Sequence, residues 1–152
     1  MPRPKKNRLV EKPPLFCNFK PIGVPANTLQ QMNLSLDQYE AIRLADFLGM
    51  GHAEAAEEMD ISRSTFTRLI EQARHKMAEF LISGRLLQIE GGNIHFKGNR
   101  IKCADCGHMF NTAFQTEISA CPSCGSTNLF DLAGSFGHGR CCRNRGQKNY
   151  IK

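Results

Sequence analysis

The chain has 152 residues, a length that suits one ordinary domain or two small ones. A hydrophobic content of 41% is enough for a core, and no run approaches the roughly 18 apolar residues of a membrane span. No apolar segment follows the basic N-terminus, so we expect a cytoplasmic protein without a secretory signal or a membrane partner.

The N-terminal region is basic and rich in proline. Residues 1–14 predict a basic flexible arm, which is either a disordered tail or lies along phosphates or in a minor groove. The stretch PPLFCNFKPIGVP contains too much proline for a helix, so we expect an extended segment in which Cys17 is a small buried thiol. Four of its apolar side chains are expected to pack on a helical core: Leu15, Phe16, Phe19 and Ile22.

A supporting helix is predicted from Ser35 to Gly49. Ser35 and Gln38 have the spacing of a capping box, and Gly49 is a suitable helix end. The apolar residues expected to cover the two following helices are Leu36, Ile42, Leu44 and Leu48.

Residues 52–77 predict a short helix, a tight turn and a longer helix, the pattern of a helix-turn-helix. Small alanines at 55 and 56 allow two helices to cross closely, and Ser62 is placed to cap the second helix. Asp60 stands where such turns usually have glycine, because the turn visits the left-handed region. Aspartate tolerates that conformation better than most residues.

The second helix of such a unit reads the DNA major groove with its N-terminal half. Arginine can donate bidentately to guanine. The candidate base readers are Ser62, Arg63, Ser64, Thr67 and Arg68, and the candidate phosphate contacts are Arg74 and Lys76. The alternative is an ordinary amphipathic helix with a solvated basic face, and the turn pattern with its SRST cap favours the helix-turn-helix.

The net charge of +6 is unevenly distributed. Residues 35–90 are acidic overall, with six Lys or Arg against ten Asp or Glu, whereas both flanking regions are basic. Within the acidic region, residues 61–76 carry four basic residues and one acid. This asymmetry favours one docked orientation on a nucleic acid.

Residues 36–77 resemble region four of bacterial sigma factors in LDQYEAIRLAD, AEAAEEM and ISRSTFTRLIEQAR. Residues 17–92 resemble more closely a prokaryotic family catalogued as domain of unknown function 134, or uncharacterised protein family 0251. The matching stretches are FKPIGVP, LDQYEAIRLAD, AAEEMDISRSTF and LLQIEGG. That family is described only as predicted DNA-binding, so the resemblance implies DNA binding and a regulatory role without a known target.

After the long helix the hydrophobic pattern changes period. RLLQIEGGNIHFK predicts two short strands around Gly91 and Gly92. These strands form either a β-hairpin wing beside the helix-turn-helix or a bridge into the next module.

Seven cysteines in a chain without a signal favour metal-bound thiolates over disulfides. Two C-x-x-C pairs separated by fourteen residues predict a zinc ribbon with the ligands Cys103, Cys106, Cys121 and Cys124. Four thiolates fill the shell of a tetrahedral zinc ion, so the expected role is folding, and iron is the lesser alternative. His108 lies beside the first C-x-x-C pair, but four cysteine ligands leave no coordination position for its imidazole.

The C-terminal tail, residues 134–152, contains His138, Cys141 and Cys142 among basic residues. Adjacent cysteines are poor chelators of one ion in a regular backbone. We therefore favour a flexible basic tail that contacts nucleic acid nonspecifically over a second metal or redox site.

Together these patterns predict a mainly α fold with the arm, a helix-turn-helix domain over residues 15–97, a zinc-ribbon-like β module over residues 98–133 and the tail. No phosphate-cradling glycine motif, nucleophile elbow or open metal site appears, so we expect a binding protein and no enzyme. The favoured function is a sequence-specific transcriptional regulator that binds double-stranded DNA as a homodimer. The alternatives are an adaptor that binds RNA polymerase or another transcription protein, and a metal- or redox-responsive sensor that uses Cys141, Cys142 or the ribbon thiols.

Overall fold

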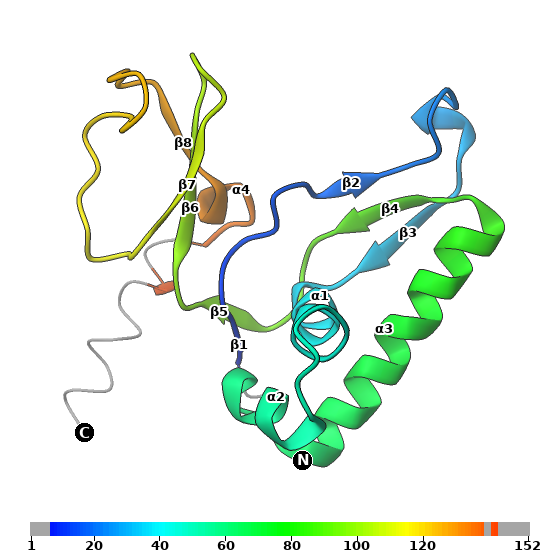
Figure 1. The fold of residues 1–152 in the computed structure, drawn as a ribbon. Coiled ribbons are helices and arrows are strands. Elements are labelled where there is room, and N and C mark those ends of the chain that lie inside the picture. The colour runs from blue at the N-terminus through cyan, green and yellow to red at the C-terminus, as the bar shows by residue number, and fades with distance from the viewer. Residues whose placement is uncertain (1–6, 139–140, 143–152) are drawn as a thin grey trace. The chain divides into compact units, whose positions relative to one another are not determined.

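The computed structural model describes residues 7–138 and 141–142 (Figure 1). The chain divides into two compact units, one of residues 1–9 and 15–94 and the other of residues 10–14 and 95–152. Strands Arg8–Val10 (β1) and Ile94–Phe96 (β5) pair with each other, and within each of them the chain passes from one unit to the other.

Parts of the two predicted flexible segments fall outside the described residues. Of the arm, residues 1–6 are outside, whereas Arg8–Val10 belongs to β1 and the side chain of Val10 is fully buried. Of the tail, residues 139–140 and 143–152 are outside.

The first unit contains the predicted helices. Their bounds are Leu36–Ile42 (α1), the π-helical turn Arg43–Phe47 (η2), His52–Met59 (α2) and Arg63–Ser83 (α3), with a short 3-10 turn at Ala26–Thr28 (η1). The predicted capping box is confirmed, because the Ser35 hydroxyl accepts from the Gln38 amide and the Gln38 side chain accepts from the Ser35 amide.

The turn between α2 and α3 also has its predicted local structure. Asp60 adopts the left-handed conformation, with φ 57° and ψ 46°. The Ser62 hydroxyl accepts from the Thr65 amide at 3.2 Å and so caps α3. The left-handed aspartate and the serine cap are therefore both confirmed.

One apolar core joins the helices of the first unit, because α1 and α2 both pack on α3. Ala55 is fully buried and Ala56 nearly so, which lets α2 approach α3 closely. The buried residues of this core are Ala41, Leu44, Ala55, Ala56, Met59, Phe66, Leu69 and Ile70. Removing each large side chain from water contributes about 1.5–3 kcal/mol to this packing.

A three-stranded sheet completes the first unit, with strand order β2-β4-β3. Its strands are Asn18–Phe19 (β2), Gln31–Leu34 (β3) and Leu86–Ile89 (β4). The central strand β4 runs antiparallel to β2 and parallel to β3. Leu87 and Ile89 alternate with half-buried neighbours, so one face of β4 is buried.

The predicted β-hairpin wing is wrong. β4 pairs with β2 and β3, whereas β5 pairs with β1, so these two consecutive strands belong to different sheets. Gly91 and Gly92 separate the two strands with positive φ angles of 78° and 100°. The alternative prediction, a bridge toward the second unit, agrees with the unit boundary after Ile94.

The predicted mainly α fold class is also wrong, because the described residues form three small sheets in addition to the helices, which makes the fold mixed α/β. Strands β1, β2 and β3 are two to four residues long. Strands this short show no clear alternation of apolar and polar residues in the sequence. They form by pairing with residues that are far away along the chain.

The N-terminal extended segment differs from its prediction in packing. Its four apolar side chains were expected on the helical core, but all are exposed, and Ile22 is fully so. Cys17 is exposed as well, so the buried thiol predicted there is wrong. Leu48 in the supporting helix is 49% exposed, whereas Leu36 and Leu44 are buried as predicted.

The second unit is built around a sheet of order β7-β6-β8. Its elements are Asn99–Cys103 (β6), Met109–Thr112 (β7), Leu129–Asp131 (β8) and Leu132–Ser135 (α4). The central strand β6 is antiparallel to both neighbours. Among the described residues, no helix combines the length and the apolarity needed to cross a membrane.

Gly92 gives a stability prediction for the first unit. Its φ is +100°, and a Cβ there would lie 3.0 Å from a carboxylate oxygen of Asp37, which is buried and paired with Arg8 at 2.6 Å. Gly92→Ala should therefore lower the free energy of unfolding by about 1–3 kcal/mol in urea denaturation. Gly91→Ala is the matched control, because its φ is also positive but its Cβ would meet nothing within 4 Å. If Gly92→Ala and Gly91→Ala lower the free energy of unfolding equally, the contact with Asp37 has no role in the loss.

Candidate metal centre and candidate nucleic-acid interface

The four ribbon cysteines lie on two turns of matching geometry. In the first turn the Cys103 amide donates to the His108 carbonyl, and in the second the Cys121 amide donates to the Ser126 carbonyl. The glycine after each C-x-x-C pair, at 107 and 125, has φ +77°. A residue with a Cβ is strained in that conformation, so glycine permits the tight turn that presents both sulfurs.

The sulfur atoms of the two turns converge. The Cys103 and Cys124 sulfurs are 3.6 Å apart, the Cys106 and Cys121 sulfurs are 3.7 Å apart, and all four lie within 4.8 Å of one another. Sulfurs bound at about 2.3 Å to one tetrahedral ion would be about 3.8 Å apart. The structure thus brings the four predicted ligands together in a cluster that could hold a metal ion.

The thiols of this cluster differ in acidity. Donation from the Cys106 amide lowers the pKa of Cys103 to about 7. The pKa of Cys124 is raised to about 12, because the neighbouring thiols of Cys103 and Cys106 outweigh the lowering effect of the Ser126 amide. A bound cation would displace the remaining thiol protons, since the thiolate is the ligand form.

Side chains around the cluster support its turns. The Ser126 hydroxyl donates to the Asp105 carboxylate, and Ser126 also accepts from the Asn128 amide at 3.1 Å. His108 is exposed, and its ring stacks on Phe110 with centroids 5.8 Å apart. The four sulfurs therefore form the cluster without His108.

The second candidate site is the N-terminal half of α3. Arg63, Ser64 and Arg68 are exposed, whereas Phe66 and Leu69 are buried in the core. Among the described residues, neither arginine makes an ion pair. Both guanidinium groups are therefore available to an anionic partner.

Two of the predicted base readers also have structural contacts. The Ser62 hydroxyl is engaged as the cap of α3. Thr67 is half-buried, and its hydroxyl lies 2.9 Å from Nδ1 of His52, whose ring also packs edge-on against Phe66. Sequence reasoning missed His52 because it lies fifteen residues from Thr67, on the other helix of the pair.

The two predicted phosphate contacts differ in availability. Arg74 is half-exposed and paired with Asp46 at 2.7 Å, and this partner raises the pKa of Arg74. The Lys76 ammonium instead donates to the Asn33 carbonyl and the Gln38 side chain, both at 2.8 Å. Lys76 therefore connects α3 to β3 and α1, and the structure does not place it with Arg63 and Arg68.

Comparison with known proteins identifies the family. The family model described as "Protein of unknown function DUF134" matches residues 1–97. The chain belongs to this family. The resemblance predicted from LDQYEAIRLAD and the other matching stretches is thereby confirmed as to family.

Relatives match over most of this chain. A UPF0251 protein of Chloroherpeton thalassium is 49% identical over 150 residues, covering 97% of this chain and 99% of the relative. A UPF0251 protein of Pelotomaculum thermopropionicum is 45% identical over 126 residues, covering 83% and 95%. One of Moorella thermoacetica is 41% identical over 145 residues, covering 95% of each chain. No solved structure gives a significant match.

Proposed function

We propose that this protein is a sequence-specific DNA-binding regulator in which α2 and α3 act as a helix-turn-helix. The observation that carries the proposal is the exposed N-terminal half of α3, where Arg63, Ser64 and Arg68 project from one side of the helix. At about 100° per residue, positions 63, 64, 67 and 68 fall within an arc of about 140°. A helix of this kind fits the major groove and can read base edges there.

The electrostatics of α3 agree with this proposal. The first turn of α3 contains no acidic residue, and Ser62 caps it through its hydroxyl rather than through a carboxylate. The positive end of the helix dipole therefore adds to the charge of Arg63. Base contacts come from Arg63, Ser64 and Arg68, Thr67 contributes through a hydroxyl that His52 orients, and Arg74 approaches the phosphates.

The cysteine cluster of the second unit has a structural role in this proposal. The ion is zinc, since four thiolates at tetrahedral spacing are a usual zinc shell. Such a shell leaves no position for a substrate, so the ion holds the strands β6, β7 and β8 together and takes no part in catalysis.

A second candidate function, a protein-interaction adaptor, is favoured by exposed apolar side chains of the first unit. Phe16 is 61% exposed, and Leu81 and Ile82 near the end of α3 are 74% and 88% exposed. Apolar side chains that form a contiguous exposed patch mark surfaces that bind another protein, and Leu81 and Ile82 are neighbours in the chain. The partner is RNA polymerase, another transcription protein or a second copy of the chain.

Fluorescence anisotropy distinguishes the two functions. The metal-loaded full chain is titrated against a labelled duplex from upstream of its own gene and against a shuffled duplex, at two salt concentrations. The regulator predicts tighter binding of the upstream duplex that persists at the higher salt. Equal binding that disappears with salt would reduce the role of α3 to phosphate contact, and absence of binding would favour the adaptor.

A further inference from the structure

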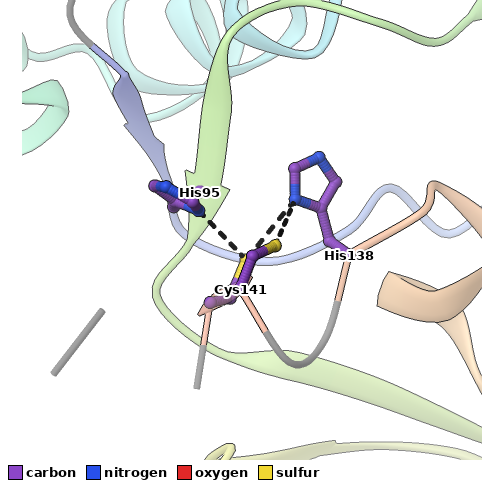
Figure 2. A group of neighbouring side chains, drawn as sticks. His95, His138 and Cys141 are labelled. Carbon is purple, nitrogen blue, oxygen red and sulfur yellow. Dashed lines mark hydrogen bonds between the residues drawn. The ribbon is translucent and has the colours of Figure 1, made fainter. Parts of the chain in front are cut away.

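A second group of metal-binding side chains lies in the second unit, away from the four ribbon cysteines. His95 is on β5, His138 follows α4, and Cys141 and Cys142 are adjacent to each other. Figure 2 shows the rings of His95 and His138 on two sides of Cys141. One ligand atom from each of the four residues lies within 4.8 Å of the other three.

Four distances between ligand atoms of this group lie close to those of a tetrahedral shell. The two sulfurs of Cys141 and Cys142 are 3.8 Å apart. Nδ1 of His138 is 3.2 Å from the Cys141 sulfur and 3.6 Å from the Cys142 sulfur. Nδ1 of His95 is 3.7 Å from the Cys142 sulfur. With bonds of about 2.3 Å to sulfur and about 2.0 Å to nitrogen, a tetrahedral ion would separate its ligand atoms by about 3.3–3.8 Å.

The surroundings hold these ligand atoms in place. Cys142 is 4% exposed, and its sulfur accepts from the Phe96 amide at 3.1 Å. Phe96 is fully buried and lies against the His138 ring, with centroids 5.3 Å apart. Hydrogen bonds from outside the shell and a surrounding apolar layer are the usual support of a metal site.

We propose that His95, His138, Cys141 and Cys142 bind a second metal ion of the zinc class. Two sulfurs and two imidazole nitrogens at tetrahedral spacing select zinc among the common divalent ions. Binding releases two thiol protons, one each from Cys141 and Cys142, and the two thiolates balance the charge of the ion. The shell is complete, so the ion holds His138, Cys141 and Cys142 to His95 of β5.

The sequence contains part of this signal. His138 and Cys141 are separated by two residues, the same gap that each ribbon knuckle has. Cys142 joins them although it is adjacent to Cys141, because its sulfur lies 3.8 Å from the Cys141 sulfur and 3.6 Å from Nδ1 of His138. His95 is 47 residues from Cys142 and reaches it only through the fold.

The test is the number of zinc ions retained by the full chain after equilibration with a moderate chelator, measured by elemental analysis against protein concentration. The wild-type chain should retain two ions. The His138→Ala/Cys141→Ser double variant should retain one, because His95 and Cys142 alone cannot compete with the chelator. Cys17→Ser is the matched control, since Cys17 is exposed and belongs to neither cluster, and it should retain two.

A spectroscopic measurement keeps the two sites distinguishable. Cobalt(II) loading of the wild-type chain and of His138→Ala/Cys141→Ser gives two visible spectra. Their difference should be the absorption of a tetrahedral site with two thiolates, weaker in charge transfer than a four-thiolate site. A single ion in the wild-type chain, two ions retained by His138→Ala/Cys141→Ser, or identical cobalt spectra of the two chains would overturn the second site.

Discussion

Cys121→Ser is expected to release the ribbon metal ion and to unfold the sheet of β6, β7 and β8 while α1, α2 and α3 keep their structure. Cys121 is 3% exposed, and its amide and sulfur both hold the second knuckle. A structural zinc ion contributes about 10–16 kcal/mol of apparent binding free energy in small zinc domains, more than the stability of most such modules. Local unfolding should therefore be complete.

Amide hydrogen exchange of the full chain measures this effect by region. Protection should be lost in residues 99–131 and retained in α3, whose core residues lie in the first unit. Cys17→Ser should leave exchange unchanged throughout, because its side chain is exposed. Loss of protection in α3 as well would show that the two units do not fold independently.

Structure that depends on neighbouring residues was predictable from this sequence. Ser35 caps α1 through an amide three residues away, Ser62 does the same for α3, and Asp60 adopts the left-handed conformation of the turn between α2 and α3. The ribbon cysteines belong to the same class, since a two-residue gap and a following glycine are enough to shape each knuckle. These features require no knowledge of distant contacts.

Structure that depends on distant pairing was not predictable. β3 lies parallel to β4, with Met32 opposite Leu87, and nothing in either four-residue stretch specifies its partner. The exposure of Phe16 and Ile22 was not predictable either. The prediction assumed that apolar residues near a helical core must cover that core, whereas both side chains are exposed. Thr67 and Lys76 were correctly placed on α3, but their contacts with His52 and Asn33 come from other elements.

The group of His95, His138, Cys141 and Cys142 shows why the spacing of residues along the chain gave too little weight to a metal site in the tail. Adjacent cysteines chelate poorly when the backbone is regular, and that argument disfavoured a site at Cys141 and Cys142. The structure supplies two further ligands, His138 from the same segment and His95 from β5. The four ligand atoms lie within 4.8 Å of one another, and they could form the tetrahedral shell that we propose, which a cysteine pair alone could not.

The largest functional effect is expected from Arg63→Ala and Arg68→Ala. Each should weaken binding of the upstream duplex by about 1–3 kcal/mol, because a bidentate arginine contact to guanine is lost. The double variant should bind the upstream and shuffled duplexes equally. Both side chains are exposed and outside the core, so the free energy of unfolding should be unchanged. The measurement is the anisotropy titration at two salt concentrations, with urea denaturation as the check on folding.

Lys20→Ala provides the matched control for charge. Lys20 is exposed in the first unit and its ammonium donates only to the Val24 carbonyl among the described contacts. Its loss removes one positive charge without touching α3, so any general electrostatic contribution should appear equally in this variant. If Arg63→Ala and Arg68→Ala weaken binding no more than Lys20→Ala does, α3 is not the reading helix. A loss of preference for the upstream duplex in the arginine variants, with the salt dependence unchanged, would instead separate base reading from phosphate attraction.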